Sequence, residues 1–177
     1  MEAINWDAIA ALSEAFGAIA VVASLIFVGL QVRQSTDAAK IEAVHNISTE
    51  WRSVYQGPAN NRQVAEILIR GGLDYKNLDA IDLAQYSAIM HTIFDAAAST
   101  YYQYDKGALD SETFDGICRQ LRQRLGLPGV RDYWMSRKEI YSEQFQAYVD
   151  KEIVPYASNE LYRQYKGDSD ESTGVES

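Results

Sequence analysis

Cysteine is nearly absent from the sequence, which has 177 residues and a single cysteine, Cys118. One thiol excludes a disulfide framework within the chain, and it leaves no second cysteine at the spacing that thiolate metal sites use. A reducing compartment is therefore permitted, although cysteine usage alone does not assign one.

Positive charge is also scarce, because 16 Lys and Arg residues stand against 25 Asp and Glu residues, giving a formal net charge of −9. Surfaces that bind nucleic acid need a basic footprint to neutralise phosphates. The composition therefore argues against DNA and RNA as partners and opposes non-specific adsorption to anionic lipid. The length suits one globular unit with its own core.

Charge of either sign is missing from residues 15–32, an uncharged run of 18 residues between Glu14 and Arg33. As a helix, this run would extend roughly 27 Å, close to the ~30 Å hydrocarbon thickness of a bilayer. All of its faces are apolar or small, whereas a helix on the surface of a soluble core keeps a polar stripe. We therefore predict a transmembrane helix, with a fully buried helix in a soluble bundle as the alternative.

The flanks of this run predict a retained anchor and its orientation. A cleaved signal peptide begins with basic residues, but the residues before the run are acidic and include no Lys or Arg. The first cations, Arg33, Lys40 and Arg52, follow the run. By the positive-inside rule, the N-terminus should lie outside and the C-terminal part in the cytoplasm.

The rest of the chain shows helical periodicity and no strand alternation. Since residues 30–56 contain neither Gly nor Pro, the anchor helix should continue into the following domain as far as Gly57-Pro58. We predict an all-α fold with an N-terminal segment and anchor over residues 1–34, a bundle of about five helices over residues 35–166, and a disordered acidic tail over residues 167–177.

Glycine, proline and capping residues divide the predicted bundle into segments. The segments are a helix over residues 59–70 closed by Gly71-Gly72, a helix over residues 78–104, a helix capped by Asp110, a turn over residues 126–129, a helix through Trp134 and Tyr148 as far as Pro155, and a last helix with Leu161 and Tyr165. The helical segments carry apolar residues at spacings of three and four, which is typical of helices that bury one face.

Five short motifs resemble a group of uncharacterised small bacterial membrane proteins. The motifs are "NW-x-AI" beginning at Asn5, "GAIAVVASLI" over residues 17–26, "Q-x-RQ" over residues 31–34, "YYQYDKGALD" over residues 101–110 and "PGVRDYW" over residues 128–134. The resemblance implies a single-pass protein of the bacterial inner membrane with a helical cytoplasmic domain. It implies no catalytic residue, because no activity is established for the group.

Four residues are candidate metal ligands. Glu42 and His45 form an E-x-x-H pair, which places a carboxylate and an imidazole on one helix face, as in di-iron bundles. His91 and Asp95, at positions i and i+4, would add two more ligands. A second E-x-x-H and two further Glu are not evident, so the alternative is polar helix residues without a metal, and we expect no cofactor.

No pattern indicates a catalytic nucleophile or a phosphate-binding loop. Cys118 has no motif around it and is expected to pack in the core. Tyr86, Tyr101, Tyr102 and Tyr104 share one helical register, and we expect them to contribute to the core, with an aromatic ligand pocket as the alternative.

Two surfaces are candidates for contact with other molecules. Arg119, Arg122 and Arg124 concentrate positive charge and would suit lipid headgroups or an acidic partner, the alternative being ion pairs within the domain. The small residues of the anchor fall on one helix face, where a second helix can approach closely, or they merely face lipid. This candidate self-association face consists of Ser13, Gly17, Ala20 and Ser24.

These observations predict a membrane-anchored helical protein that binds another protein or itself and is not an enzyme. Its expected partners are membrane lipid, through the N-terminal helix, and a second protein or a second copy. The alternative is a membrane-tethered enzyme or sensor that holds a small ligand or a metal among its helices.

Overall fold

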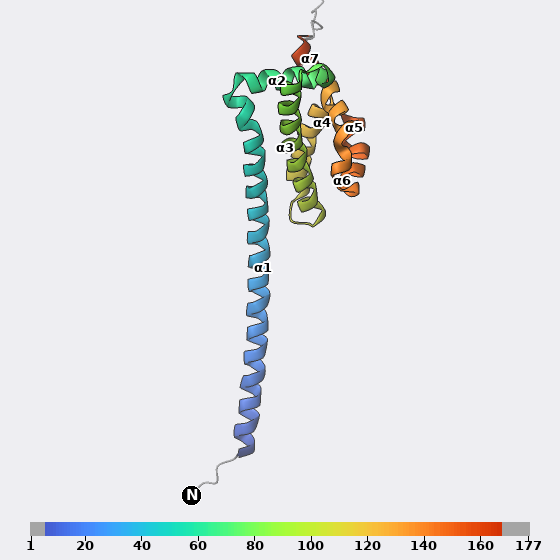
Figure 1. Ribbon diagram of the computed structural model, residues 1–177. Coiled ribbons are helices and arrows are strands. Elements are labelled where there is room, and N and C mark those ends of the chain that lie inside the picture. Colours follow the sequence, from blue (N-terminus) through green and yellow to red (C-terminus); the bar gives the residue numbers. More distant parts are fainter. Residues whose placement is uncertain (1–5, 168–177) are drawn as a thin grey trace, which may run out of the picture. The chain divides into compact units, whose positions relative to one another are not determined.

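The computed structural model describes residues 6–167, with side chains for Glu14 and residues 16–167, and the predicted tail lies outside this range from residue 168 on. The described chain is mostly helical and contains no strand, so the predicted all-α fold is confirmed (Figure 1). The α-helices are α1 (Trp6–Asn60), α2 (Arg62–Asp74), α3 (Ala80–Asp105), α4 (Ser111–Leu125), α5 (Pro128–Arg137), α6 (Glu143–Tyr148) and α7 (Glu160–Lys166). Short 3-10 or π turns lie at η1 (Tyr75–Asn77), η2 (Lys138–Ile140), η3 (Val149–Ile153) and η4 (Val154–Tyr156).

The chain divides into two compact units, Met1–Glu42 and Ala43–Ser177. Helix α1 contributes to both and ends at Asn60, two residues after Pro58. In the second unit, Ile47, Trp51 and Val54 of this helix follow one another at spacings of four and three residues and are buried. The amphipathic pattern therefore marks the part of α1 that belongs to the helical domain.

Helix α2 does not stop at Gly71-Gly72, so that predicted boundary is wrong. Both glycines are buried, and the helix continues to Asp74. A Cβ atom at Gly71 would overlap the ring of Tyr86, and one at Gly72 would lie 3.0 Å from the Cδ1 atom of Leu127. These glycines permit close helix packing rather than a helix stop.

Capping residues set the start of α3 and α4. Asp79 begins α3, since its Oδ1 accepts hydrogen bonds of 2.9 Å from the amides of Ile81 and Asp82. Asp110 begins α4 as predicted, accepting from the amide of Thr113 at 2.9 Å. Each bond satisfies an N–H group that has no partner inside the helix.

The segment after α4 differs from the prediction in two ways. Residues 126–129 do not form only a turn, because α5 begins at Pro128, which suits the first helical position. The single helix predicted as far as Pro155 is interrupted, and α6 starts anew where the Ser142 Oγ accepts from the amide of Phe145 at 3.3 Å. This local cap competes with continuation of the preceding helix.

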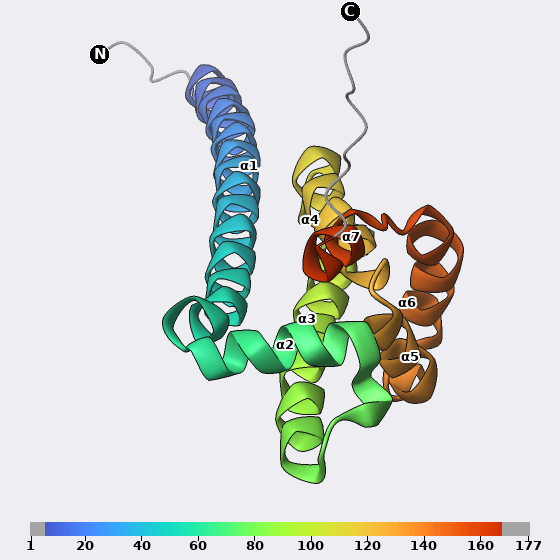
Figure 2. The same cartoon turned by 90° about the horizontal axis from the view of Figure 1, so that it is seen from above.

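Helix α3 is central to the helical domain, where it packs against α2, α4, α5 and α6 (Figures 1 and 2). The core between these helices is rich in aromatic side chains. Phe94 of α3 stacks on Trp134 of α5 with ring centroids 5.0 Å apart, and Trp134 meets Phe145 of α6 edge to face at 5.9 Å. Such pairs add to the stabilisation that comes from burial alone.

One buried hydrogen bond links α1 to α3. The Trp51 Nε1 donates to the Thr100 Oγ1 at 3.2 Å, and the Thr100 hydroxyl donates to the carbonyl of Ala96 at 2.7 Å. Thr100 is fully buried and polar, so its hydroxyl is retained inside an otherwise apolar core.

Replacing Thr100 with valine should destabilise the helical domain by about 1 to 3 kcal/mol, because the indole N–H of Trp51 would stay buried without an acceptor. Urea unfolding followed by tryptophan fluorescence would measure this loss. Thr92→Val is the matched control, since Thr92 is exposed on the same helix and bonds only to the carbonyl of Ala88. Equal unfolding midpoints for the two variants would contradict the assigned role of Thr100.

Candidate functional site

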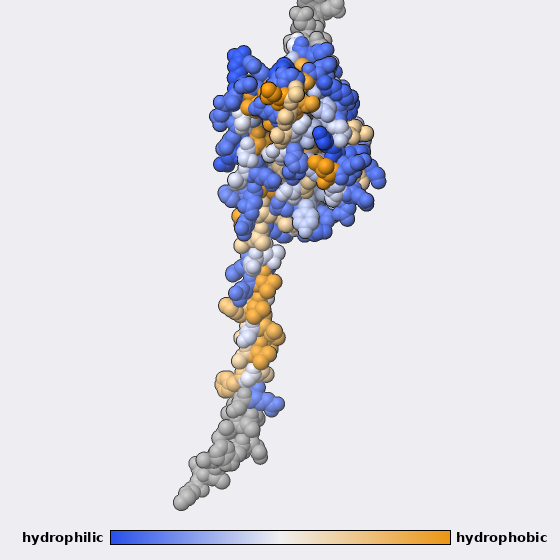
Figure 3. All heavy atoms as spheres, viewed as in Figure 1, coloured by the Kyte–Doolittle hydropathy of each residue, from blue (hydrophilic) through white to orange (hydrophobic). Residues whose placement is uncertain are grey.

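The uncharged run forms an exposed apolar surface on α1. Helix α1 is long and apolar enough to cross a membrane, and none of its most apolar stretch is buried in the described structure. Leu25 and Phe27 are 66% and 68% exposed. In Figure 3 the visible face of this stretch is mostly orange, whereas polar residues dominate the visible surface of the helical domain. A soluble core helix would bury these side chains, so the alternative of a fully buried first helix is not observed.

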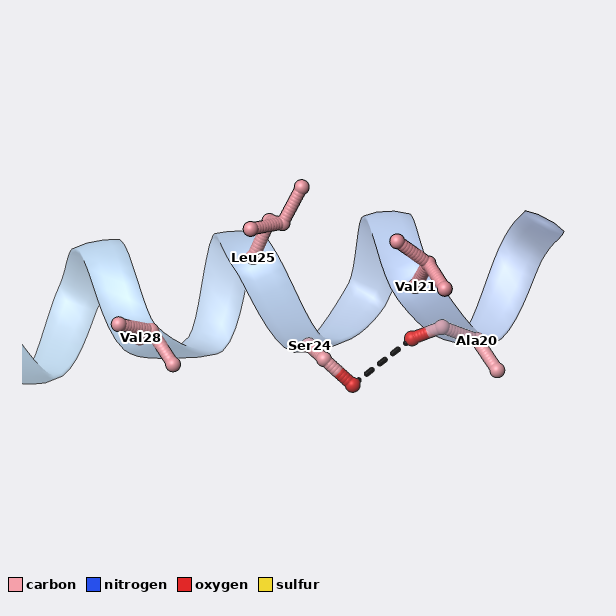
Figure 4. Close-up of a pocket in the computed structure, with 5 residues that line it drawn as sticks. All are labelled: Ala20, Val21, Ser24, Leu25 and Val28. Atoms are coloured by element: carbon pink, nitrogen blue, oxygen red, sulfur yellow. Dashed lines mark hydrogen bonds between the residues drawn. The ribbon is translucent and has the colours of Figure 1, made fainter. Parts of the chain in front are cut away.

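Gly17, Ala20 and Ser24 of the candidate self-association face lie on this exposed stretch. Ala20 and Ser24 line a shallow groove with Val21, Leu25 and Val28 (Figure 4). The Ser24 hydroxyl donates to the carbonyl of Ala20 at 2.8 Å, so it already has an acceptor within the helix.

Gly17 is not among the residues that line the groove. A Cβ atom at Gly17 would meet nothing within 4 Å, and the side chain of Ser13 lies outside the described residues. Self-association through this face stays a prediction.

The candidate metal ligands do not converge. The His91 Nε2 lies 3.2 Å from the Asp95 Oδ2, as the i, i+4 spacing suggests. The described residues hold no group of three or more His, Cys, Asp and Glu side chains that could bind a metal ion, so His45 does not complete this pair. Glu42 belongs to the first compact unit, whereas His45, His91 and Asp95 belong to the second.

The second ring nitrogen of His91 has a partner that the sequence did not indicate. The His91 Nδ1 shares a hydrogen bond of 3.2 Å with the hydroxyl of Tyr141, whose ring packs against Phe94. The imidazole therefore bridges α3 and the loop before α6. This tyrosine lies 50 residues away in the chain, and local spacing could not have found it.

The three candidate arginines have different surroundings. Arg119 is exposed, whereas Arg122 donates from Nε and Nη2 to the carbonyl of Glu152 at 3.3 and 3.1 Å. The guanidinium of Arg124 lies over the ring of Tyr55, 5.2 Å from its centroid. Two of the three side chains are thus engaged within the helical domain.

The candidate tyrosines have different surroundings. Tyr101 lies against Tyr148, with ring centroids 4.9 Å apart, and Tyr104 stacks on Phe114 at 4.0 Å, whereas Tyr102 is 62% exposed. The contacts of Tyr101 favour packing against the core over an aromatic ligand pocket, whereas the exposed Tyr102 and Tyr104 do not lie in the core as predicted.

Two further polar groups, the hydroxyl of Tyr86 and the thiol of Cys118, are buried in the core. The Tyr86 hydroxyl has no hydrogen-bond partner among the described residues, and burial raises the pKa of Tyr86 above its ordinary value, which keeps this hydroxyl protonated. The Cys118 Sγ lies 3.2 Å from the Tyr148 hydroxyl, and burial raises the pKa of this thiol. A buried thiol with a raised pKa is a poor nucleophile.

Comparisons with known proteins leave the function to be argued from the residues themselves. No family model matches this chain, no curated protein matches it, and no solved structure matches it.

Proposed function

We propose that this chain is a protein of the bacterial inner membrane that holds a helical interaction domain at the cytoplasmic face. The observation that carries the proposal is the exposed apolar stretch of α1, none of which is buried in the described structure. Water would oppose exposure of so many large apolar side chains, whereas lipid would accept them. The motifs that resemble small bacterial membrane proteins support the same location.

The proposed orientation rests on the cations. Lys and Arg are absent before the apolar stretch, and Arg33 and Lys40 follow it on α1. Translocating these cations would be unfavourable, so the domain should stay on the cytoplasmic side.

Reporter fusions test this orientation. An alkaline phosphatase that needs oxidised cysteines should be inactive when it is fused after Gly167 and active when it is fused before Met1. A fluorescent reporter that matures only in the cytoplasm should give the opposite pattern at the same two positions. Phosphatase activity at the C-terminal fusion would show that the proposed orientation is wrong.

The proposed interaction role is supported by large apolar side chains that are exposed on the helical domain. Ile81, Met135 and Ile140 are 78%, 60% and 59% exposed. Light scattering of the full chain in mild detergent measures self-association, and affinity purification followed by mass spectrometry identifies a second protein. A monomer that retains no partner in native-like detergent would argue against the interaction role.

A further inference from the structure

A groove in the helical domain is lined by the last part of α1, by α4 and by α7. Its volume is about 390 Å³, which lies within the usual range of small-molecule sites. The lining residues are Tyr55, Gln120, Gln123, Arg124, Leu161 and Tyr165. The groove therefore combines apolar walls with several polar groups.

Arg124 supplies a positive charge that the described residues leave uncompensated. No described carboxylate lies within 4.0 Å of its guanidinium, and no described residue accepts a hydrogen bond from it. The guanidinium lies over the ring of Tyr55, 5.2 Å from its centroid. A cation–π contact occupies no hydrogen-bond acceptor, so the N–H donors of Arg124 stay available to an anion.

Two amide groups add further donors to the groove. The Tyr55 hydroxyl donates to the Oε1 of Gln120, which fixes the side chain of Gln120 and leaves its NH₂ group without a described acceptor. Gln123 is exposed one turn of α4 further on and also has no described side-chain bond. The side chains of Arg124, Gln120 and Gln123 thus offer more free hydrogen-bond donors than acceptors.

The apolar walls limit what kind of anion fits. Leu161 and Tyr165 of α7 line the groove together with Tyr55 of α1. A carboxylate pairs with a guanidinium through two parallel hydrogen bonds, and a flat apolar body can pack between aromatic rings.

We propose that this groove binds a small organic carboxylate with a planar apolar body, whose carboxylate pairs with Arg124. Gln120 and Gln123 donate to the remaining carboxylate lone pairs, and the two tyrosine rings and Leu161 contact the body. The site belongs to the second unit and adds ligand binding to the proposed interaction role.

Fluorine NMR of the full chain in dodecyl maltoside micelles tests this site, with 4-fluorobenzoate as the probe and empty micelles as the blank. The probe resonance should broaden and shift in a saturable way, and neutral 4-fluorobenzamide should bind at least about tenfold more weakly. Equal binding of the two probes, or no saturable binding of the benzoate, would overturn the proposal.

Variants of α4 and α7 locate the bound probe. Arg124→Gln should raise the Kd for 4-fluorobenzoate about tenfold, because it removes the charge and the paired donors. Arg119→Gln removes the same charge from an exposed site outside the groove and should leave the Kd within about twofold. Leu161→Trp should fill the groove and abolish binding, and circular dichroism would check that each variant is folded. A Kd that follows Arg119 rather than Arg124 would reject the groove as the site.

Discussion

Arginine at both Val22 and Leu25 is expected to release the protein from the membrane. Both side chains lie near the middle of the exposed apolar stretch, where each arginine would cost about 2.5 to 3.5 kcal/mol on insertion. Two such charges outweigh the modest gain from the apolar residues that remain. The double variant should move from the carbonate-washed membrane pellet to the supernatant, whereas the unchanged protein should stay in the pellet.

The matched control places the same two charges on α1 outside the uncharged run. Gln34→Arg together with Ile41→Arg should leave the protein in the pellet, since Ile41 is exposed but follows the apolar stretch. Tryptophan fluorescence of the released variant should show an intact core. Retention of the Val22 and Leu25 double variant in the washed pellet would mean that something other than this helix holds the protein to the membrane.

Replacing Gly129 with alanine should destabilise the helical domain by about 3 kcal/mol or more. A Cβ atom at this position would overlap the backbone carbonyl of Gly71, and backbone cannot move aside as a flexible side chain can. The change therefore forces α2 and α5 apart and disrupts contacts on both sides. Urea unfolding of the full chain, followed by the fluorescence of the buried Trp51 and Trp134, measures the effect.

Gly116→Ala controls for the exchange of glycine for alanine within a helix. A Cβ atom at Gly116 would meet only the Arg119 Nη2, at an ordinary 3.7 Å. Alanine should therefore raise the free energy of unfolding by about 0.5 to 1 kcal/mol through its helix propensity. If Gly129→Ala unfolded at the same urea concentration as the original protein, the close contact of α2 and α5 would be disproved.

These glycines also show where sequence reasoning fails for the fold. The cap at Asp110 can be predicted from the sequence because its hydrogen bond reaches only three residues along the chain. The sequence predicts helix stops or turns at Gly71 and Gly129. In the structure these two glycines instead lie where α2 and α5, which are distant in the chain, are in close contact. A glycine that ends a helix and a glycine that admits a neighbouring backbone have the same local signature, and only the tertiary packing separates them.

The candidate sites also divide into those that local spacing predicts and those that arise only from tertiary packing. The pairing of His91 with Asp95 follows from helical spacing, and the structure contains it. The bond from His91 to Tyr141, and the groove around Arg124, join segments that are far apart in the chain. Residues such as Tyr55 and Leu161 carry no signal of their own, because their common surface exists only after the helices have packed.

The contact between Gly71 and Gly129 also bears on the order in which the domain assembles. All of α3 and α4 lies between the two glycines, whereas α3 and α4 are joined by a short loop. Closing a long loop costs more chain entropy than closing a short one, and no local contact offsets that cost in advance. We therefore expect α3 and α4 to pair early in folding, and the crossing of α2 and α5 to complete the domain late.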